Sequence, residues 1–196
     1  MFSLRNTLTV ALTFGTAVAD TFTLTASLPG SPLDGLAVNA GGEAFHLGGS
    51  PGFYCPTSVG SACPNTTETI FAAELTALDV EVPGGQQVYV QANGALGFTQ
   101  AHSASVPVGA TIGGFVNVTV ASDCHAPWEV ITWKSPDGST GGIEACSEVP
   151  VGTNGTAVYN VYAVTPAYNQ TGCVKLAGLL ASYLGTGAGF GAWQYI

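Results

Sequence analysis

The stretch Gln86-Gln-Val-Tyr-Val-Gln-Ala-Asn-Gly-Ala-Leu-Gly-Phe-Thr99 decides the fold class of this chain. Two segments with apolar residues at alternate positions, Gln86 to Ala92 and Ala95 to Thr99, flank the pair Asn93-Gly94. This pair tolerates positive φ, which a two-residue type I′ turn requires at both central positions. The stretch therefore predicts an antiparallel β-hairpin.

Alternate side chains of such a hairpin point to opposite faces of the sheet. We expect Val88 and Val90 to face the interior. The outward face then carries a polar and aromatic stripe, formed by Gln87, Tyr89 and Gln91. Amide and aromatic side chains suit contact with a glycan, so these three residues are the candidate glycan-contact residues.

Two further parts of the chain carry the same signature. They are Leu36 to Asn39 with Glu43 to Leu47 around Gly41-Gly42, and Val130 to Ser135 with Gly142 to Cys146 around Pro136-Asp137-Gly138. Three hairpins predict an all-β fold, and no linker divides residues 20–196, so we expect one compact, disulfide-bonded domain. A β-trefoil-like arrangement is preferred to a β-sandwich, although the three segments show no alignable repeat.

A third alternating run contains a glycosylation motif. Val116, Val118 and Val120 alternate with Asn117 and Thr119. Period-two alternation predicts a strand whose three valines face the core. We therefore expect Asn117 to point outward.

The segment Val174 to Leu184 is ambiguous, whereas helical periodicity is nearly absent elsewhere. Helical spacing is shown by Leu176, Leu179, Leu180 and Tyr183. Gly185 could end such a helix.

The first nineteen residues are typical of a secretory signal peptide. Arg5 is the early positive charge, Leu8 to Phe14 form a short apolar run, and Ala17-Val18-Ala19 offers the small residues that a signal peptidase accepts. We expect residues 1–19 to be removed, which leaves residues 20–196. The apolar run is too short for a membrane anchor. The expected location is extracellular or in a cell wall.

N-glycosylation sequons support this expectation, because all of them lie in the mature part. They are at Asn65, Asn117, Asn154 and Asn169. A eukaryotic secreted glycoprotein is therefore expected.

The chain is strongly acidic. Its formal charge is -9, and the loss of Arg5 with the signal peptide lowers it by one, to -10. A surface of this sign repels phosphate backbones and anionic lipid, so neither nucleic acid nor a membrane is an expected partner. We expect a monomer.

Five cysteines in an oxidising compartment imply disulfide pairs and one leftover thiol. Cys55 and Cys63 frame a short segment that contains proline and glycine, and we pair them. Cys146 with Cys173 is the next choice, which leaves Cys124 as the free thiol. Structural disulfides are favoured over a redox role.

The sequence shows no catalytic constellation. Cys124 beside His125 could belong to a nucleophile pair or a metal site, but no further ligands stand at a supporting spacing. Asp79 and Glu81 share a strand face opposite the apolar residues, which is typical of solvated charges. A Gly-x-Ser-x-Gly elbow and a phosphate-binding loop are absent. We expect no catalytic residue, no cofactor and no metal ligand.

The segment from Val80 to Ala104 resembles a family of small secreted fungal proteins that are usually described as IgE-binding proteins. That family is distantly similar to the cell-wall protein needed for phialide development in moulds. Shorter matching elements lie across nearly the whole mature chain: Thr21-Phe22-Thr23-Leu24, Tyr54-Cys55-Pro56, Ala62-Cys63-Pro64, Gly172-Cys173 and Ala192-Trp193-Gln194-Tyr195.

The resemblance implies the same two disulfides, Cys55 with Cys63 and Cys146 with Cys173. This chain departs from the pattern because Cys124 is an extra cysteine and Ser147 follows Cys146 where proline is expected. A disulfide from Cys124 to Cys146 or Cys173 therefore stays open as an alternative.

The resemblance also implies a secreted or wall-associated, mannosylated protein with allergen or elicitor character and no established enzymatic activity. Our leading hypothesis is a non-catalytic secreted fungal glycoprotein that acts by surface binding. Its partner would be a cell-wall polysaccharide, or a host receptor or antibody. The alternative is a secreted glycoside hydrolase that works at acid pH with a carboxylate pair that sequence patterns do not locate.

Overall fold

The computed structural model describes the chain in five ranges: 20–64, 66–123, 126–147, 158–185 and 189–196. The expected signal peptide of residues 1–19 lies outside the described residues. So do two of the sequon asparagines, Asn65 and Asn154, and the expected free thiol, Cys124.

The described residues form an all-β structure, as the sequence predicts. Its strands are β1 (Phe22–Ser27), β2 (Val38–Gly41), β3 (Ala44–Leu47), β4 (Phe53–Tyr54), β5 (Phe71–Ala72), β6 (Ala77–Leu78), β7 (Gln86–Val90), β8 (Leu96–Phe98), β9 (Phe115–Val120), β10 (Trp128–Trp133), β11 (Ile143–Ser147), β12 (Tyr159–Ala163), β13 (Cys173–Lys175), β14 (Gly178–Tyr183) and β15 (Gln194–Tyr195). Two short 3-10 helices accompany them, η1 (Gly60–Ala62) and η2 (Ala73–Leu75). No helix among the described residues is long and apolar enough to cross a membrane.

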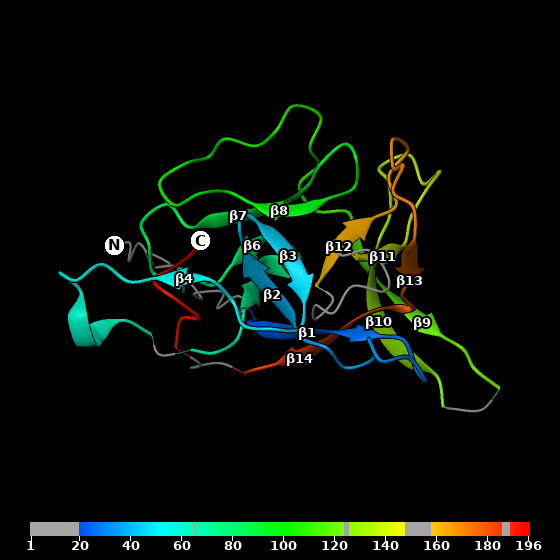
Figure 1. Ribbon diagram of the computed structural model, residues 1–196, viewed down its shortest axis with the longest axis horizontal. Coiled ribbons are helices and arrows are strands. Elements are labelled where there is room, and N and C mark those ends of the chain that lie inside the picture. Colours follow the sequence, from blue (N-terminus) through cyan, green and yellow to red (C-terminus); the bar gives the residue numbers. More distant parts are fainter. Residues whose placement is uncertain (1–19, 65, 124–125, 148–157, 186–188) are drawn as a thin grey trace, which may run out of the picture.

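Thirteen of the described strands join one hydrogen-bonded order, β13-β11-β12-β3-β8-β7-β6-β5-β1-β14-β10-β9, with β2 paired to β3 (Figure 1). An isolated bridge between Lys134 and Gly141 joins the end of β10 to the start of β11. The strand order therefore curls back on itself. Strands β4 and β15 pair separately. The preference for a β-trefoil-like arrangement over a β-sandwich stays a prediction.

Two of the three expected hairpins are confirmed. In the central one, Val88 pairs with Phe98 and Val90 with Leu96 across the Asn93-Gly94 turn. Gly94 has a φ of 93°, which glycine adopts at little cost. Asn93 does not have a positive φ, so the predicted type I′ turn, which needs positive φ at both central positions, is wrong. In the first hairpin, β2 and β3 pair over four residues. Its turn is Gly42-Glu43, one residue later than expected, because Gly41 pairs with Ala44.

The third hairpin forms only at its turn. The Gly138 N–H donates to the Ser135 carbonyl at 2.9 Å, and the Gly142 N–H donates to the Trp133 carbonyl at 2.9 Å. Hydrogen bonds from Ser135 and Ser139 lower the pKa of Asp137, in this turn, to about 2. Beyond the turn the strands separate, because β10 pairs with β9 and β14 while β11 pairs with β12 and β13.

The ambiguous segment is strand, so its helical interpretation is wrong. β14 pairs with β1 over six residues, from Phe22 opposite Tyr183 to Ser27 opposite Gly178. Leu179 is fully buried and also faces β10, opposite Ile131. This pairing on two edges outweighs the local helical spacing.

The expected orientation of β9 is also wrong. The register places Phe115 opposite Trp133 and Asn117 opposite Ile131, and both β10 residues belong to the core. Phe115 and Asn117 therefore share the face that continues the core, and the valines lie on the other face, with Val116 37% exposed. Asn117 is nevertheless exposed, because β9 ends the strand order.

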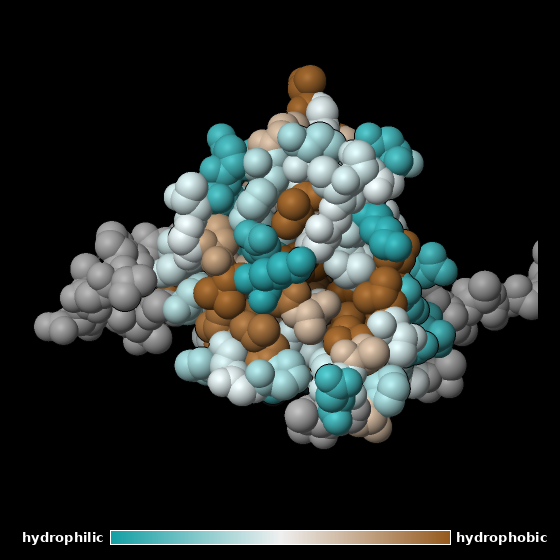
Figure 2. All heavy atoms as spheres, turned by 90° about the vertical axis from the view of Figure 1, so that its right-hand side faces the viewer, coloured by the Kyte–Doolittle hydropathy of each residue, from teal (hydrophilic) through white to brown (hydrophobic). Residues whose placement is uncertain are grey.

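One cluster of buried apolar side chains lies between the strands. Its aromatic centre is formed by Phe45, whose ring centroid is 5.5 Å from that of Phe71 and 5.4 Å from that of Phe98. Trp133 is 1% exposed, as its shared face with Ile131 predicts. On the side of the molecule where β9 to β13 lie, apolar residues show through a mainly hydrophilic surface (Figure 2).

A buried glutamine connects the C-terminal strand to this core. The Gln86 amide nitrogen donates to the carbonyls of Thr99 and Tyr195, both at 2.9 Å, and its oxygen accepts from the Tyr195 N–H at 2.8 Å. The Tyr195 hydroxyl accepts from the Ile70 N–H and donates to the Glu68 carbonyl, each at 3.0 Å. Burial raises the pKa of Tyr195 to about 12.

Both expected disulfides are present. Cys55 and Cys63 close the short segment around η1, with 6.2 Å between their Cα atoms. Cys146 and Cys173 lie directly opposite each other on β11 and β13, with a Cα separation of 4.2 Å.

Candidate functional site

A long loop follows β8 and lies over the central hairpin, where it forms the upper part of the molecule in Figure 1. Its first residues are held against β7, because the Thr99 N–H donates to the Gln87 carbonyl and the Gln87 N–H donates to the Thr99 hydroxyl, both at 2.9 Å. Further on, Thr111 and Val90 exchange two backbone hydrogen bonds of 2.8 Å. The loop is thus attached to β7 at both ends.

Two adjoining grooves run beside the start of this loop. The first has a volume of about 790 Å³ and includes Gln87, His102 and Ser103 in its lining. The second, of about 470 Å³, includes Glu43, Gln100 and again His102. Because His102 borders both grooves, we treat these five residues as one site, called the loop site below.

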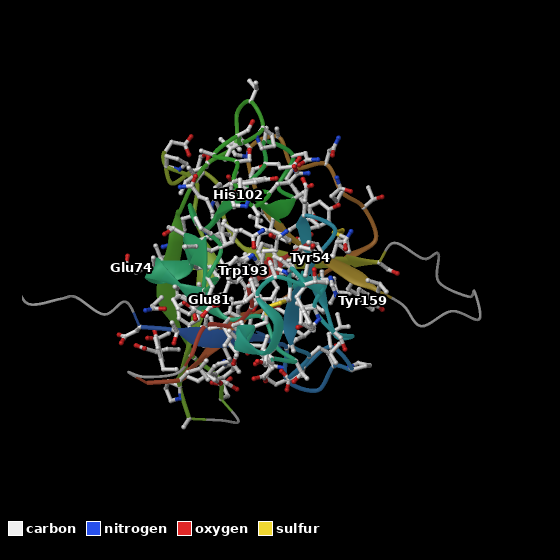
Figure 3. The ribbon with its side chains drawn as sticks, turned by 90° about the vertical axis from the view of Figure 1, so that its left-hand side faces the viewer. Tyr54, Glu74, Glu81, His102, Tyr159 and Trp193 are labelled. Atoms are coloured by element: carbon white, nitrogen blue, oxygen red, sulfur yellow. A yellow bond between two sulfur atoms is a disulfide. The ribbon has the colours of Figure 1, made fainter. Side chains whose placement is uncertain are left out.

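The polar side chains of the loop site come from three separate segments. The Gln100 amide donates to the Glu43 carboxylate, which ties the loop to the β2–β3 turn. Gln87 comes from β7 and is half-buried. His102 is exposed on the same side of the molecule as Tyr54 and Trp193 (Figure 3).

Two of these residues have a backbone conformation that side chains rarely adopt. Glu43 has a φ of 61° and His102 a φ of 62°. A left-handed conformation costs a non-glycine residue about 1–2 kcal/mol. Such strain persists where surrounding contacts enforce it, and it clusters at functional sites. Here both strained residues line the same groove.

Val88 and Val90 belong to the core cluster, and Tyr89 lies on the opposite face of β7, as expected. Tyr89 is nevertheless only 5% exposed, so the expected exposed stripe is wrong at this position. Tyr89 pairs with Gly97, and a side chain on Gly97 would collide with the Tyr89 ring, so the ring lies close against this glycine. Burial and the negative charge of Glu43 raise the pKa of Tyr89. Gln91 is half-buried and does not line the grooves of the loop site.

The loop site offers amide, carboxylate, imidazole and hydroxyl groups over an apolar floor that includes Phe98. These groups donate and accept hydrogen bonds. Hydrolysis of a glycoside requires two carboxyl groups on either side of the scissile bond. Glu43 is the one carboxylate side chain in the two groove linings. Among the described residues, no group of three or more His, Cys, Asp or Glu could hold a metal ion.

A third groove lies at the β9 end of the strand order. It has a volume of about 760 Å³, and we call it the β9 groove. Its lining consists of Asp20, Phe22, Ala73, Glu74, Thr76, Phe115, Val116, Asn117, Ile131 and Tyr183. Both of its carboxylates, those of Asp20 and Glu74, are exposed to solvent. A glycosidase acid needs burial to raise its pKa. Figure 3 shows Glu74 at the edge of the face that carries His102.

The other candidates from the sequence are placed as follows. Asn117 and Asn169 are exposed, so both described sequon asparagines are accessible. Asp79 is half-buried, and this burial raises its pKa, opposed by a hydrogen bond from the Gly191 N–H. The strand pattern predicts that Asp79 is fully exposed to solvent, and its partial burial shows that this prediction is wrong.

Sequence reasoning missed Glu43, Gln100, His102 and Ser103. Glu43 occupies the second central position of a type I′ turn, where Gly or Asn is usual. A glutamate at a turn position that favours Gly or Asn is unusual, and this could have been read from the sequence. The other three residues belong to the stretch that carries the family resemblance, but polar loop residues have no periodicity that would distinguish them.

Comparisons with known proteins agree with this resemblance. The family model described as "PhiA-like secreted protein" matches residues 22–196. An "Uncharacterized secreted protein" of Arthroderma benhamiae is 38% identical over 178 residues, covering 88% of this chain and 84% of that protein. No solved structure gives a significant match. The chain therefore belongs to the PhiA-like secreted protein family, and the protein is secreted.

Proposed function

We propose that this protein is a non-catalytic, cell-wall-associated glycoprotein that binds wall polysaccharide at the loop site. One observation carries the proposal: Glu43 and His102, both in the left-handed conformation, project from separate segments into one groove, with Gln100 bonded to Glu43. Surrounding contacts hold both residues in this strained conformation. Their polar side chains are thereby kept in a fixed arrangement.

Charge indicates which polysaccharides suit this site. The mature chain has two basic residues, Lys134 and Lys175, against twelve Asp and Glu. Neither lysine lines the grooves of the loop site. An acidic surface repels anionic polymers. Neutral wall polysaccharides such as chitin, β-glucan and mannan are therefore the proposed partners. Recognition by a host receptor or antibody stays a prediction from the resemblance.

The double variant Gln87→Ala/His102→Gly tests the proposal. Glycine keeps the left-handed conformation at residue 102 while removing the imidazole. We expect at least about tenfold weaker binding to one of the three insoluble polysaccharides, since each lost hydrogen bond contributes about 0.5–1.5 kcal/mol. Co-sedimentation at pH 5 and pH 7 measures the bound fraction.

The matched control is Gln170→Ala, which removes a half-buried amide outside the loop site and keeps the Asn169 sequon. This variant should bind like the wild type. Equal binding by the double variant and the wild type would overturn the assignment of the loop site. Failure of the wild type on all three polysaccharides at both pH values would remove the proposed function.

A further inference from the structure

The sequon at Asn117 has a particular setting on strand β9. Directly opposite residues of paired strands place their side chains on the same face. Phe115 lies opposite Trp133, Asn117 opposite Ile131, and Thr119 opposite Glu129. An aromatic ring, the glycan acceptor and the sequon threonine therefore follow one another along one face of the strand.

This face borders the β9 groove, whose lining includes apolar side chains. Phe115 is half-buried and packs against the core cluster. Tyr183 of β14 also lines the groove. It is 63% exposed, and its ring centroid lies 5.5 Å from that of Phe22. Asn117 itself lines this groove. A group attached to Asn117 would thus meet exposed aromatic surface on its own molecule.

We propose that an N-linked glycan on Asn117 lies in the β9 groove of the same molecule, with its first N-acetylglucosamine packed on the Phe115 ring. The link forms in the secretory pathway from a lipid-diphosphate-linked oligosaccharide. The Asn117 amide nitrogen bonds to C1 of the first sugar and loses a proton, while the C1–O bond to the lipid diphosphate breaks.

The physical basis is burial of apolar surface. A pyranose ring presents C–H groups on one face, and the flat face of an aromatic side chain covers them, so both leave water. The aromatic residue stands two positions before the acceptor, which is the period that keeps both side chains on one face. The glycan would also cover an edge strand, which is otherwise open to pairing with another chain.

The β9 groove shares none of the five residues of the loop site, so this proposal is independent of the proposed function. Its test begins with mass spectrometry of the Asn117 peptide from protein secreted by a fungal host. Occupied Asn117 is expected, and an unoccupied site overturns the proposal.

Thermal unfolding then measures the contribution of the first sugar. Asn117→Gln should lower the Tm by about 2–4 °C, the shift typical of one lost contact in a chain of this size. Trimming the wild-type glycan with endoglycosidase H, which leaves one N-acetylglucosamine, should preserve the Tm. Asn169→Gln is the matched control, because Asn169 is exposed and does not line the β9 groove.

The Phe115→Leu background separates packing from a general effect of glycosylation. There Asn117→Gln should lower the Tm by less than half as much as in the wild type. Equal shifts in both backgrounds, or the same shift for Asn169→Gln, overturn the proposal. Should Phe115→Leu fail to fold, nuclear Overhauser contacts in the trimmed wild type decide. Contacts between the sugar ring and the Phe115 ring are expected, and their absence contradicts the packing.

Discussion

Replacement of Gln86 by alanine is expected to lower the free energy of unfolding by about 3–5 kcal/mol, because it leaves three buried backbone groups without a partner. These groups are the carbonyls of Thr99 and Tyr195 and the Tyr195 N–H. Gln86 is 2% exposed, so the groups that it binds lie away from bulk water. Urea unfolding, followed by tryptophan fluorescence with the disulfides intact, measures the change.

The neighbouring glutamine provides the control. Gln87 is half-buried, and its backbone N–H, rather than its side chain, donates to Thr99. Gln87→Ala should change the free energy of unfolding by no more than about 0.5 kcal/mol. A loss below about 1 kcal/mol for Gln86→Ala, or equal losses for the two variants, would show that Gln86 does not hold the C-terminal strand in place.

Gly94→Ala is expected to cost about 3–5 kcal/mol. Part of this cost is the positive φ of 93°, which alanine avoids. The larger part is a collision, because a Cβ atom on Gly94 would lie 2.2 Å from the Ala163 carbonyl oxygen. The Ala163 N–H also donates to the Gly94 carbonyl at 2.8 Å, so β12 would have to move away from the turn. Urea unfolding again reports the loss.

Gly138→Ala isolates the conformational part of this cost. Gly138 has a φ of 71°, and a Cβ atom there would have no heavy atom within 4 Å. Its expected cost is therefore the left-handed strain alone, about 1–2 kcal/mol. If Gly94→Ala and Gly138→Ala cost the same, contact with β12 is not what makes Gly94 necessary.

These two glycines illustrate what the sequence could predict. Asn93-Gly94 and Gly41-Gly42 locate their turns because Gly94 and Gly42 adopt a positive φ, which glycine adopts at little cost. Local chemistry of this kind needs no knowledge of the rest of the fold. It also predicted the Pro136-Asp137-Gly138 turn, but not that β10 and β11 separate beyond it, since each strand's other partners are distant in the sequence.

Long-range pairing explains the other differences. The helical spacing within residues 174–184 is real, but β1 and β10 pair with both edges of β14 and leave no room for a helix. Alternation on β9 predicts a strand without saying which face meets the core. The Tyr89 ring lies close against Gly97, and glycine within a strand marks such close approach. This glycine was a readable signal.

The candidate site was accessible to sequence reasoning only in part. Gln87 was identified by its outward position, and it does line a groove. The loop after β8 folds back over β7 and β8 and so brings Gln100 and His102 close to Gln87 and Glu43. No periodic pattern describes a loop, so this meeting depends on tertiary structure.

The most direct test of binding without catalysis is a heteronuclear NMR titration of the glycosylated protein with soluble chitin, β-glucan and mannan oligosaccharides. Saturable amide shifts at Gln87, Gln100 and His102 are predicted with one of them, while the length of that oligosaccharide stays unchanged. Shifts confined to surfaces outside the loop site, or progressive shortening of the oligosaccharide, would contradict the account.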